Sequence, residues 1–244
     1  MKIHVLFSAA YCDELNFSGK NTIVIDVLRA TTVIATALSN GAREIIPVGS
    51  IDFAMKISGN SSDRQTLLCG ERNTKMIDGF NLGNSPFEYS KEIVEGKSIV
   101  LYTSNGTKSV VKAKYSDNLF TAAFVNLSSV VEAVKDYEEI QILCSGSSGP
   151  FCIEDTVCAG NIISELSKIK NQPELTDAGL ASLLLYERHE NNILAMLKNS
   201  EHGKLLIENG FGKDIEFCSQ VNLFQVAPKL SNGVLKNISQ IVND

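Results

Sequence analysis

The chain alternates short runs of β-branched and aliphatic residues with stretches in which apolar residues recur every three or four positions. The first pattern predicts strands, and the second predicts amphipathic helices packed against them. We predict strands at 1–10, 23–25, 44–48, 98–102, 140–143 and 221–226. We predict helices at 31–40, 107–113 and 155–168, and one long helix or two over 176–198. Gly41 is placed to end the first helix.

This alternation indicates an α/β fold, layered α/β/α, with a mixed or mostly parallel sheet. No linker rich in Pro, Gly or Ser divides the chain, and the most polar stretch, 58–65, is typical of a loop. We therefore expect one compact α/β unit over residues 1–244, with room for two lobes. Ligands of open α/β sheets bind beyond the carboxyl ends of the strands, so the residues after each strand are of most interest.

Three predicted strands are followed by polar clusters that lead into a helix. The clusters are Asp26 with Arg29, then Ser104, Asn105, Gly106 and Thr107, and then Ser145 with Glu154 and Asp155. Hydroxyls, amides and glycines at a helix start suit an anion, because the helix N-terminus offers free N–H groups. Arg29 could add a bidentate grip on a phosphate or sulfonate. Each turn alone is more typical of a helix cap, but three of them favour a shared phosphate site.

A fourth polar cluster spans 70–88 and contains Glu71, Arg72, Asn84 and Ser85. Glu71 and Arg72 follow the apolar run 67–69, so they could also sit at a strand end. Ser85 and Glu88, with Pro86 between them, form a capping box with proline at the first helical position. A capped helix start also presents N–H groups, so this structural role does not exclude a role in binding.

The acids after the strands suggest a metal. Asp26, Glu71, Glu154 and Asp155 are hard oxygen ligands, and no His/Cys set competes, so Mg²⁺ is favoured over zinc. Adjacent side chains at a helix start diverge by about 100°, so we expect only one of Glu154 and Asp155 to bind the ion. An N-cap or a surface ion pair is the alternative for any one of these acids.

Composition and known signatures exclude several classes. The 28 acidic and 22 basic residues give a net charge of −6, which argues against nucleic acid as a partner. No apolar run approaches the roughly 18–20 residues of a membrane span, and six scattered cysteines without a CxxC pair suggest buried thiols in the cytoplasm. The signatures of P-loop enzymes, cysteine phosphatases, haloacid dehalogenases and α/β-hydrolases are missing. His189 and His202 lack a recognisable catalytic context and are more typical of a helix face and a helix end, and a site role stays open for His202.

Taken together and in this order, the polar clusters resemble the 2-phosphosulfolactate phosphatase family from about residue 3 to 228. The matching segments are 26–32, 41–42, 70–72, 79–86, 104–107, 144–146 with 154–155, 159–160, and 200–203 with 210–211. The chain departs from the family pattern at three positions: it has Ser104 where Thr is usual, Asn81 where Asp is usual, and Ser145 where Ala is usual. If the usual acid at position 81 bound metal, that role is weakened here.

The resemblance implies a Mg²⁺-dependent acid phosphatase, homodimeric and with its own α/β fold. Its reaction converts 2-phospho-3-sulfolactate and water to sulfolactate and phosphate, a step in coenzyme M biosynthesis. The catalytic acids would be Asp26, Glu71, Glu154 and Asp155, and the metal ligands Asp26 with Glu154 or Asp155. Substrate would contact Arg29, Arg72, Asn84, Ser85, Ser104, Asn105, Gly106, Thr107 and Ser145.

Within this hypothesis we expect direct hydrolysis, with Arg72 pairing with the sulfonate or carboxylate of the substrate. A covalent route through Asp26 or Cys144 stays open. Two other functions also stay open: a phosphatase for a different phosphorylated hydroxy acid, and a small-anion-binding protein without turnover. The four acids disfavour the second, because they repel an anion unless a metal intervenes.

Overall fold

The computed structural model describes residues 1–60, 65–146 and 151–241. An α/β fold is observed, as predicted, around a mixed and mostly parallel sheet of eleven strands in the order β5-β4-β6-β3-β11-β10-β7-β2-β8-β1-β9. The strands are β1 (Lys2–Leu6), β2 (Asn21–Ile25), β3 (Glu44–Pro47), β4 (Thr66–Arg72), β5 (Lys75–Met76), β6 (Ser98–Tyr102), β7 (Asn118–Ala122), β8 (Glu139–Cys144), β9 (Glu174–Leu175), β10 (Pro228–Ser231) and β11 (Val234–Asn237).

The helices connect these strands. They are α1 (Ala30–Ser39), α2 (Ile51–Asn60), α3 (Lys91–Val94), α4 (Gly106–Lys112), α5 (Leu127–Val134), α6 (Ile153–Ile169), α7 (Asp177–His189), α8 (Ile193–Asn199), α9 (Glu201–Glu208), α10 (Gly212–Cys218) and α11 (Ile238–Ile241).

The sheet consists of two parallel halves joined by an antiparallel hairpin. The larger half contains β7, β2, β8, β1 and β9, and the smaller half contains β3, β6 and β4, with β5 antiparallel at its edge. The hairpin β10–β11 links them through one residue pair on each side, Lys229 with Phe120 and Leu235 with Ile45. The halves therefore share little hydrogen bonding, and side-chain packing must hold them together.

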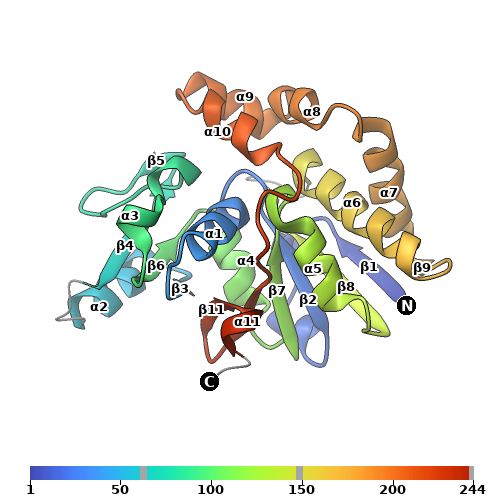
Figure 1. Ribbon diagram of the computed structural model, residues 1–244, viewed down its shortest axis with the longest axis horizontal. Coiled ribbons are helices and arrows are strands. Elements are labelled where there is room, and N and C mark those ends of the chain that lie inside the picture. Colours follow the sequence, from blue (N-terminus) through green and yellow to red (C-terminus); the bar gives the residue numbers. More distant parts are fainter. Residues whose placement is uncertain (61–64, 147–150, 242–244) are drawn as a thin grey trace.

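Helices α1 and α4 lie between the two halves (Figure 1). One buried cluster combines side chains of the larger half, the smaller half, α1 and α4, among them Val24, Leu143, Ile45, Ile99, Ile34 and Val110. Burial of apolar surface at roughly 25 cal/mol per Å² makes this shared interior a major source of cohesion. Because α1 follows β2 and α4 follows β6, the starts of both helices come to the carboxyl ends of strands from opposite halves.

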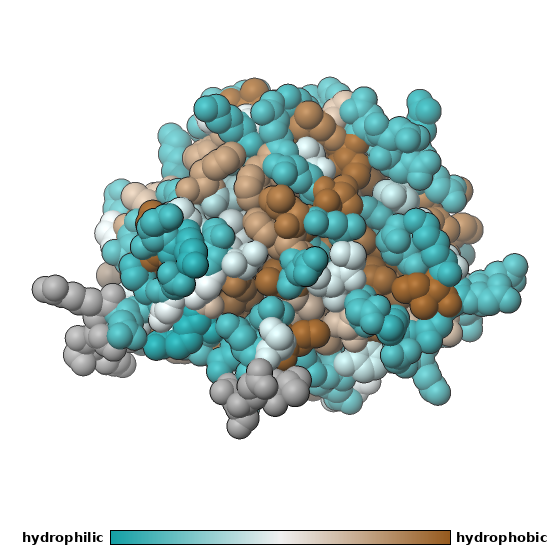
Figure 2. Space-filling model, viewed as in Figure 1, coloured by the Kyte–Doolittle hydropathy of each residue, from teal (hydrophilic) through white to brown (hydrophobic). Residues whose placement is uncertain are grey.

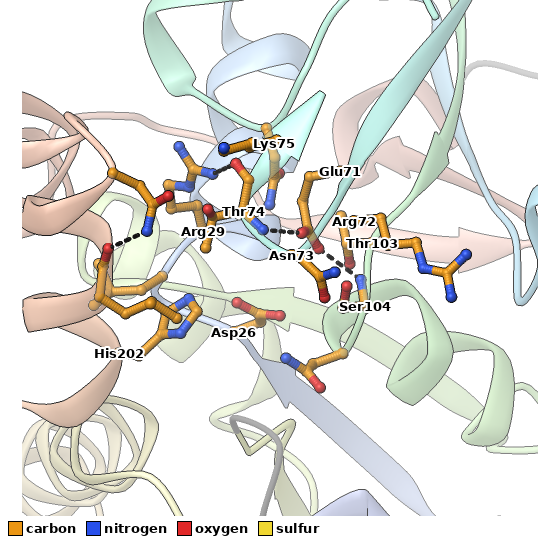
Figure 3. A pocket seen from close by; sticks show the side chains of 15 residues that line it. Asp26, Arg29, Glu71, Arg72, Asn73, Thr74, Lys75, Thr103, Ser104 and His202 are labelled. Carbon is orange, nitrogen blue, oxygen red and sulfur yellow. Dashed lines mark hydrogen bonds between the residues drawn. The ribbon is translucent and has the colours of Figure 1, made fainter. Parts of the chain in front are cut away.

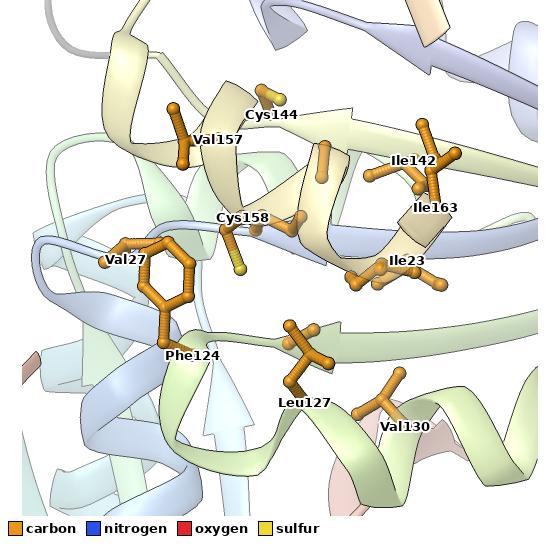
Figure 4. Close-up of a cluster of buried hydrophobic side chains, with 14 of the residues drawn as sticks. Ile23, Val27, Phe124, Leu127, Val130, Ile142, Cys144, Val157, Cys158 and Ile163 are labelled. Atoms are coloured by element: carbon orange, nitrogen blue, oxygen red, sulfur yellow. The ribbon is translucent and has the colours of Figure 1, made fainter. Parts of the chain in front are cut away.

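The outer faces of the sheet are also covered. Helices α5 and α6 pack on the larger half, where Phe124, Leu127, Val157 and Cys158 meet Ile142 (Figure 4). A smaller cluster that includes residues of α2, β4 and β6 covers the smaller half. Both faces of the central strands are therefore buried, which explains why 23–25 and 98–102 are continuous apolar runs in the sequence.

Most predicted elements are observed near their predicted positions. Strand β6 has the predicted bounds, α1 begins one residue before the predicted start, and Gly41 ends it with a φ of 89°. Residues 176–198 form two helices, α7 and α8. In the predicted loop at 58–65, residues 58–60 complete α2, and residues 61–64 lie outside the described chain.

The strand predicted at 221–226 is wrong. In this segment the Asn222 N–H donates to the Phe124 carbonyl at 2.9 Å and the Phe224 N–H to the Val125 carbonyl at 2.8 Å, so its amides bond to the 3-10 helix Phe124–Asn126 instead of a neighbouring strand. The strands lie further on, in the hairpin β10–β11, whose turn contains Asn232 and Gly233 with φ of 51° and 83°. An Asn-Gly pair between apolar runs is the usual signal of such a hairpin.

Hydrophilic residues surround most of the outline in Figure 2, and hydrophobic residues gather toward the middle of that face. The exposed hydrophobic side chains include Val221 and Leu223 in the segment that leads to the hairpin. A search of the described residues finds no helix that combines the length and the hydropathy of a membrane span.

Candidate active site

A cavity of about 520 Å³ lies where the carboxyl ends of the two halves meet. The turns after β2, β4 and β6 line it, together with His202 and Leu205 of α9 and its C-cap residue Asn209. Seven of the predicted site residues come together here: Asp26, Arg29, Glu71, Arg72, Asn84, Ser104 and Asn105. The other six, Ser85, Gly106, Thr107, Ser145, Glu154 and Asp155, lie in the surrounding structure.

Asp26 lies directly after β2 and is buried, with 7% of its surface exposed. The Thr31 hydroxyl donates to the Asp26 carbonyl at 2.8 Å and the Ala30 N–H donates to Asp26 Oδ1 at 3.2 Å, so the turn is firmly held. Burial raises the pKa of Asp26 to about 7, and the negative charges of Glu71 and Glu154 add to this effect. The site is therefore short of positive charge around this carboxylate.

Gly106, the first residue of α4, packs closely against Asp26. A Cβ at this position would lie 2.4 Å from Asp26 Oδ2 and 2.5 Å from the Ala30 Cβ. Only glycine lets α4 approach α1 this closely. The sequence predicts that Gly106 contacts the substrate. In the structure, its close packing against Asp26 and Ala30 joins turns from the two halves.

Glu71 in β4 is buried with both carboxylate oxygens occupied. Oε1 accepts the Ser104 N–H at 2.7 Å, and Oε2 accepts the Thr74 N–H at 2.9 Å (Figure 3). Asn73 and Thr74 adopt φ of 53° and 69°, so the β4–β5 turn is a tight one. The Glu71 carboxylate thus ties this turn to the β6–α4 turn, a geometry that favours positioning over proton transfer.

Arg29 crosses from the larger half to the smaller half. Its Nη1 donates to Asp214 Oδ2 at 2.6 Å, its Nη2 donates to the Thr74 carbonyl at 3.0 Å, and its guanidinium lies 4.2 Å from the Phe211 ring centroid. With 2% of its surface exposed, Arg29 is buried among these partners. The Arg29 guanidinium was predicted to bind phosphate, but the Asp214 carboxylate neutralises most of its charge. Arg29 therefore lines the cavity as a fixed group.

Two amide side chains keep unused hydrogen-bonding capacity. Asn84 is buried in the cavity wall, and its Oδ1 has no hydrogen-bond partner among the described residues. The Asn105 side chain, which precedes α4, does not cap that helix. Buried polar groups normally find partners, so these amides are the strongest candidates for contacts with a ligand.

The hydroxyls of Ser85 and Thr107 serve the scaffold. Ser85 Oγ donates to Asp214 Oδ1 at 2.9 Å, and the Glu88 carboxylate accepts the Ser85 N–H at 2.9 Å, as the predicted capping box requires. Thr107 Oγ1 accepts the Thr103 N–H at 2.8 Å and shapes the β6–α4 turn. Both residues support the wall of the cavity from behind.

Asp155 at the start of α6 bonds to backbone on both sides. Its Oδ1 accepts the Val27 N–H at 2.9 Å, and its Oδ2 accepts the N–H groups of Ser145 and Gly146 at 3.1 and 3.4 Å. Burial raises the pKa of Asp155 well above its usual range, with the charges of Asp26 and Glu154 as further causes. Asp155 therefore holds the β2–α1 and β8–α6 turns together. Residues 147–150 of the predicted third turn lie outside the described chain.

Glu154 and His202 meet at a neighbouring cavity of about 270 Å³. His202 in α9 lines this cavity and also the larger one, where its ring lies beside Asp26 (Figure 3). Burial lowers the pKa of His202, and the charge of Arg29 adds to this effect, while burial raises the pKa of Glu154. The prediction that His202 merely marks a helix end is replaced by a position in the cavity wall.

Arg72 is exposed at the rim, and Figure 3 shows its guanidinium directed away from Asp26. Cys144 lies in the buried core of the larger half, where burial raises the pKa of its thiol well above the usual range. A protonated thiol in the core is a poor nucleophile, which favours the structural role for Cys144 over the covalent one.

The three acids predicted to hold Mg²⁺ do not form a ready metal centre. Among the described residues, no three Asp, Glu, His or Cys side chains lie close enough together to hold an ion as a set. Asp155 is taken up by backbone N–H groups, and Glu154 faces the smaller cavity, so Asp26 alone of the three lines the larger one. Mg²⁺ usually keeps several waters and takes one or two protein carboxylates plus phosphate oxygens, a donor set that Asp26 fits.

The fold and the cavity define an α/β protein whose convergent strand-end turns suit a small anionic ligand. The sequence model of the family described as 2-phosphosulpholactate phosphatase matches residues 10–233. The chain belongs to the 2-phosphosulfolactate phosphatase family, which confirms the resemblance drawn from its motifs.

Similar proteins carry the name "Probable 2-phosphosulfolactate phosphatase". The protein from Thermotoga maritima is 45% identical over 215 residues, covering 88% of this chain and 91% of the relative. That from Caldanaerobacter subterraneus is 40% identical over 225 residues, covering 92% and 93%. That from Clostridium perfringens strain SM101 is 40% identical over 241 residues, covering 98% and 97%.

Proposed function

We propose that this protein hydrolyses 2-phospho-3-sulfolactate, or a closely similar phosphorylated small acid, to the hydroxy acid and phosphate. The observation that carries this proposal is the position of Asp26, a buried carboxylate in the cavity of about 520 Å³, opposite two turns from the other half of the sheet. Family membership and the names of the relatives support the substrate assignment.

The residues divide into those that meet the substrate and those that hold them. Asn84 and Asn105 have amide groups available to bind the phosphoryl oxygens, and Ser104 lies beside them. Glu71 and Arg29 fix the opposing turns through their backbone hydrogen bonds. Such fixed polar groups stabilise developing charge without having to reorganise during the reaction.

Mg²⁺ is the proposed cofactor, with Asp26 as its protein ligand. Burial raises the pKa of Asp26, with repulsion from Glu71 and Glu154 as a further cause, and a cation beside Asp26 would relieve that repulsion. When bound, the ion would polarise the phosphoryl group and neutralise its charge. Arg72 at the rim stays our candidate partner for the sulfonate or carboxylate of the substrate.

The decisive measurement is phosphate release from 2-phospho-3-sulfolactate and from phospholactate, with Mg²⁺ and with EDTA. We expect faster release from the sulfonated substrate and loss of release in EDTA. Tight binding of phosphate without release at any pH or metal concentration would instead establish an anion-binding protein. In acid-quenched single-turnover reactions, a phosphoryl group found on Asp26 by mass spectrometry supports a covalent route, whereas phosphate release without a phosphorylated enzyme supports direct attack.

Three further properties implied by the family resemblance stay proposals: a role in coenzyme M biosynthesis, a homodimer and a cytoplasmic location. Sedimentation at micromolar concentration tests the second directly. A mass near that of one 26.5 kDa chain would contradict the dimer.

A further inference from the structure

A second cavity of about 610 Å³ lies beside the first, and the two share Ser104 and Asn105. Its other walls come from the short 3-10 turn Ala9–Tyr11 and from the face of α4 that carries Lys108 and Lys112. No acid is found among the described residues that line it, whereas Asp26 and Glu71 line the first cavity. The two cavities therefore differ in the sign of the charge they present.

Among the residues that the structure describes, the two lysines of this cavity have no acidic partner. Lys112 Nζ donates to the Ala9 carbonyl at 2.8 Å, and Lys108 Nζ lies 5.7 Å from the Tyr102 ring centroid. No salt bridge to either lysine occurs among the described residues, although the nearby Lys114 pairs with Glu14. Their spacing of four residues places both ammonium groups on one face of α4, where an anion would relieve their repulsion.

Ser145 supplies an independent sign of a ligand. It lines the second cavity with 7% of its surface exposed, and its Oγ is buried with no hydrogen-bond partner among the described residues. Its backbone N–H donates to the Ile25 carbonyl at 2.9 Å and to Asp155 at 3.1 Å, so the residue is held in place. A buried hydroxyl without a partner is costly unless something outside the chain completes its bonding.

We infer that the second cavity is a subsite for a carboxylate or sulfonate group of the phosphorylated substrate, bound by Lys108, Lys112 and Ser145. The inference rests on the proposed function, because it places the phosphoryl group on the other side of the shared Ser104–Asn105 turn, near Asp26. Ammonium and hydroxyl donors form charge-assisted hydrogen bonds to such groups. The subsite would select phosphate esters that carry a further acid over neutral ones.

The test compares two double variants with the same loss of charge. In Lys108→Gln/Lys112→Gln we expect the KM for 2-phospho-3-sulfolactate to rise at least about tenfold, with the KM for glycerol 2-phosphate, which has hydroxyls in place of the acids, within about twofold. Lys135→Gln/Lys168→Gln removes two lysines that pair with Glu132 and Glu165 on the surface, and it should change neither value. An unchanged KM, or an equal rise for both esters, overturns the subsite.

The exposed Lys108→Gln single variant keeps the Lys112 contact with Ala9, and it should show a smaller rise of about threefold to tenfold for the sulfonated substrate alone. It protects the test against poor folding of the double variant. No rise in this well-folded single variant overturns the subsite, whether or not the double variant folds.

A binding measurement separates this inference from the proposed function. Titration with 3-sulfolactate, which has no phosphate, should show about tenfold weaker binding to Lys108→Gln/Lys112→Gln than to the wild type. Ser145→Ala should bind it several-fold more weakly without a lower Tm in the free protein, because the lost hydroxyl has no partner there. A wild type that turns over no 2-phospho-3-sulfolactate refutes the proposed function alone, whereas equal binding of 3-sulfolactate by all variants refutes the subsite.

Discussion

The two halves of the sheet each place a buried carboxylate in the first cavity, and the two carboxylates differ in what surrounds them. In the smaller half, Glu71 accepts backbone N–H groups from Ser104 and Thr74 at 2.7 and 2.9 Å. In the larger half, burial and the charges of Glu71 and Glu154 raise the pKa of Asp26 to about 7. The Glu71 carboxylate therefore faces hydrogen-bond donors, whereas the Asp26 carboxylate is buried near two other acids.

This difference separates positioning from chemistry. A carboxylate whose two oxygens both accept backbone N–H groups, as in Glu71, holds those donors in place. A carboxylate placed among like charges favours a proton or a cation, as groups at reactive sites often do. Asp155 belongs to the larger half and shares a raised pKa with Asp26, but it accepts three backbone N–H groups, so its hydrogen bonds and not its pKa mark it as a positioning residue.

Replacement of Asp26 tests the reactive side of the comparison. Asp26→Asn should lower kcat/KM for 2-phospho-3-sulfolactate at least about 10³-fold, because the charge that receives the cation is lost. Steady-state assays at saturating Mg²⁺ measure the effect, and an unchanged circular dichroism spectrum shows that the fold is kept. Activity within tenfold of the wild type would remove Asp26 from its proposed role.

The pH dependence of stability sharpens the same point. Because the pKa of Asp26 rises from 3.8 to about 7 on folding, the folded protein keeps a proton that the unfolded chain has released between about pH 4 and 7. The contribution of Asp26 to stability therefore falls as pH rises through this window and stays constant above it.

Asp26→Asn removes this titration. In metal-free buffer, its free energy of unfolding relative to the wild type should increase by roughly 2–4 kcal/mol from pH 4 to pH 7. Urea titrations of both proteins across this range measure the difference. A constant difference would show that Asp26 has an ordinary pKa.

Asp155 tests the positioning side within the larger half. Asp155→Asn keeps the shape of the side chain but places an amide against backbone N–H donors, so we expect a loss of about 2–3 kcal/mol in the free energy of unfolding. Surviving folded protein should keep an unchanged KM for Mg²⁺, because Asp155 is not expected to bind the ion. A large rise in that KM with normal stability would restore Asp155 as a metal ligand.

Glu71 tests positioning in the smaller half. Glu71→Gln should cost about 1–2 kcal/mol of stability and raise the KM for substrate about tenfold, because the Ser104 and Thr74 turns are no longer tied by one anion. The exposed Glu187→Gln is the matched control and should leave both quantities unchanged. If Glu71→Gln instead abolished kcat with normal stability and KM, Glu71 would belong with Asp26.

Much of the local structure could be predicted from the sequence. The strand at 98–102 and the helix after Asp26 were predictable because buried strands and helix starts leave local patterns of apolar and capping residues. The apolar run 221–226 carries a strand pattern as well, but its amides bond to residues 124–125, a contact that no local pattern records. The Asn232–Gly233 turn of the hairpin was a local signal that the prediction did not use.

Within each half, parallel strands bring their carboxyl ends to one edge, and this much follows from the sequence. The meeting of the β2 turn with the β4 and β6 turns was decided by the tertiary structure, because these strands belong to halves that are joined only through an antiparallel hairpin. Tertiary structure alone decided which acids accept hydrogen bonds from distant backbone N–H groups or pair with an arginine. Glu71 meets an N–H 33 residues away, Asp155 one 128 residues away, and Arg29 pairs with Asp214 at a separation of 185 residues. Periodicity reports the conformation of neighbouring residues, whereas the partners of a buried charge depend on the path of the whole chain. The polar groups of the site could therefore be predicted from the sequence, but their hydrogen-bond and charge partners could not.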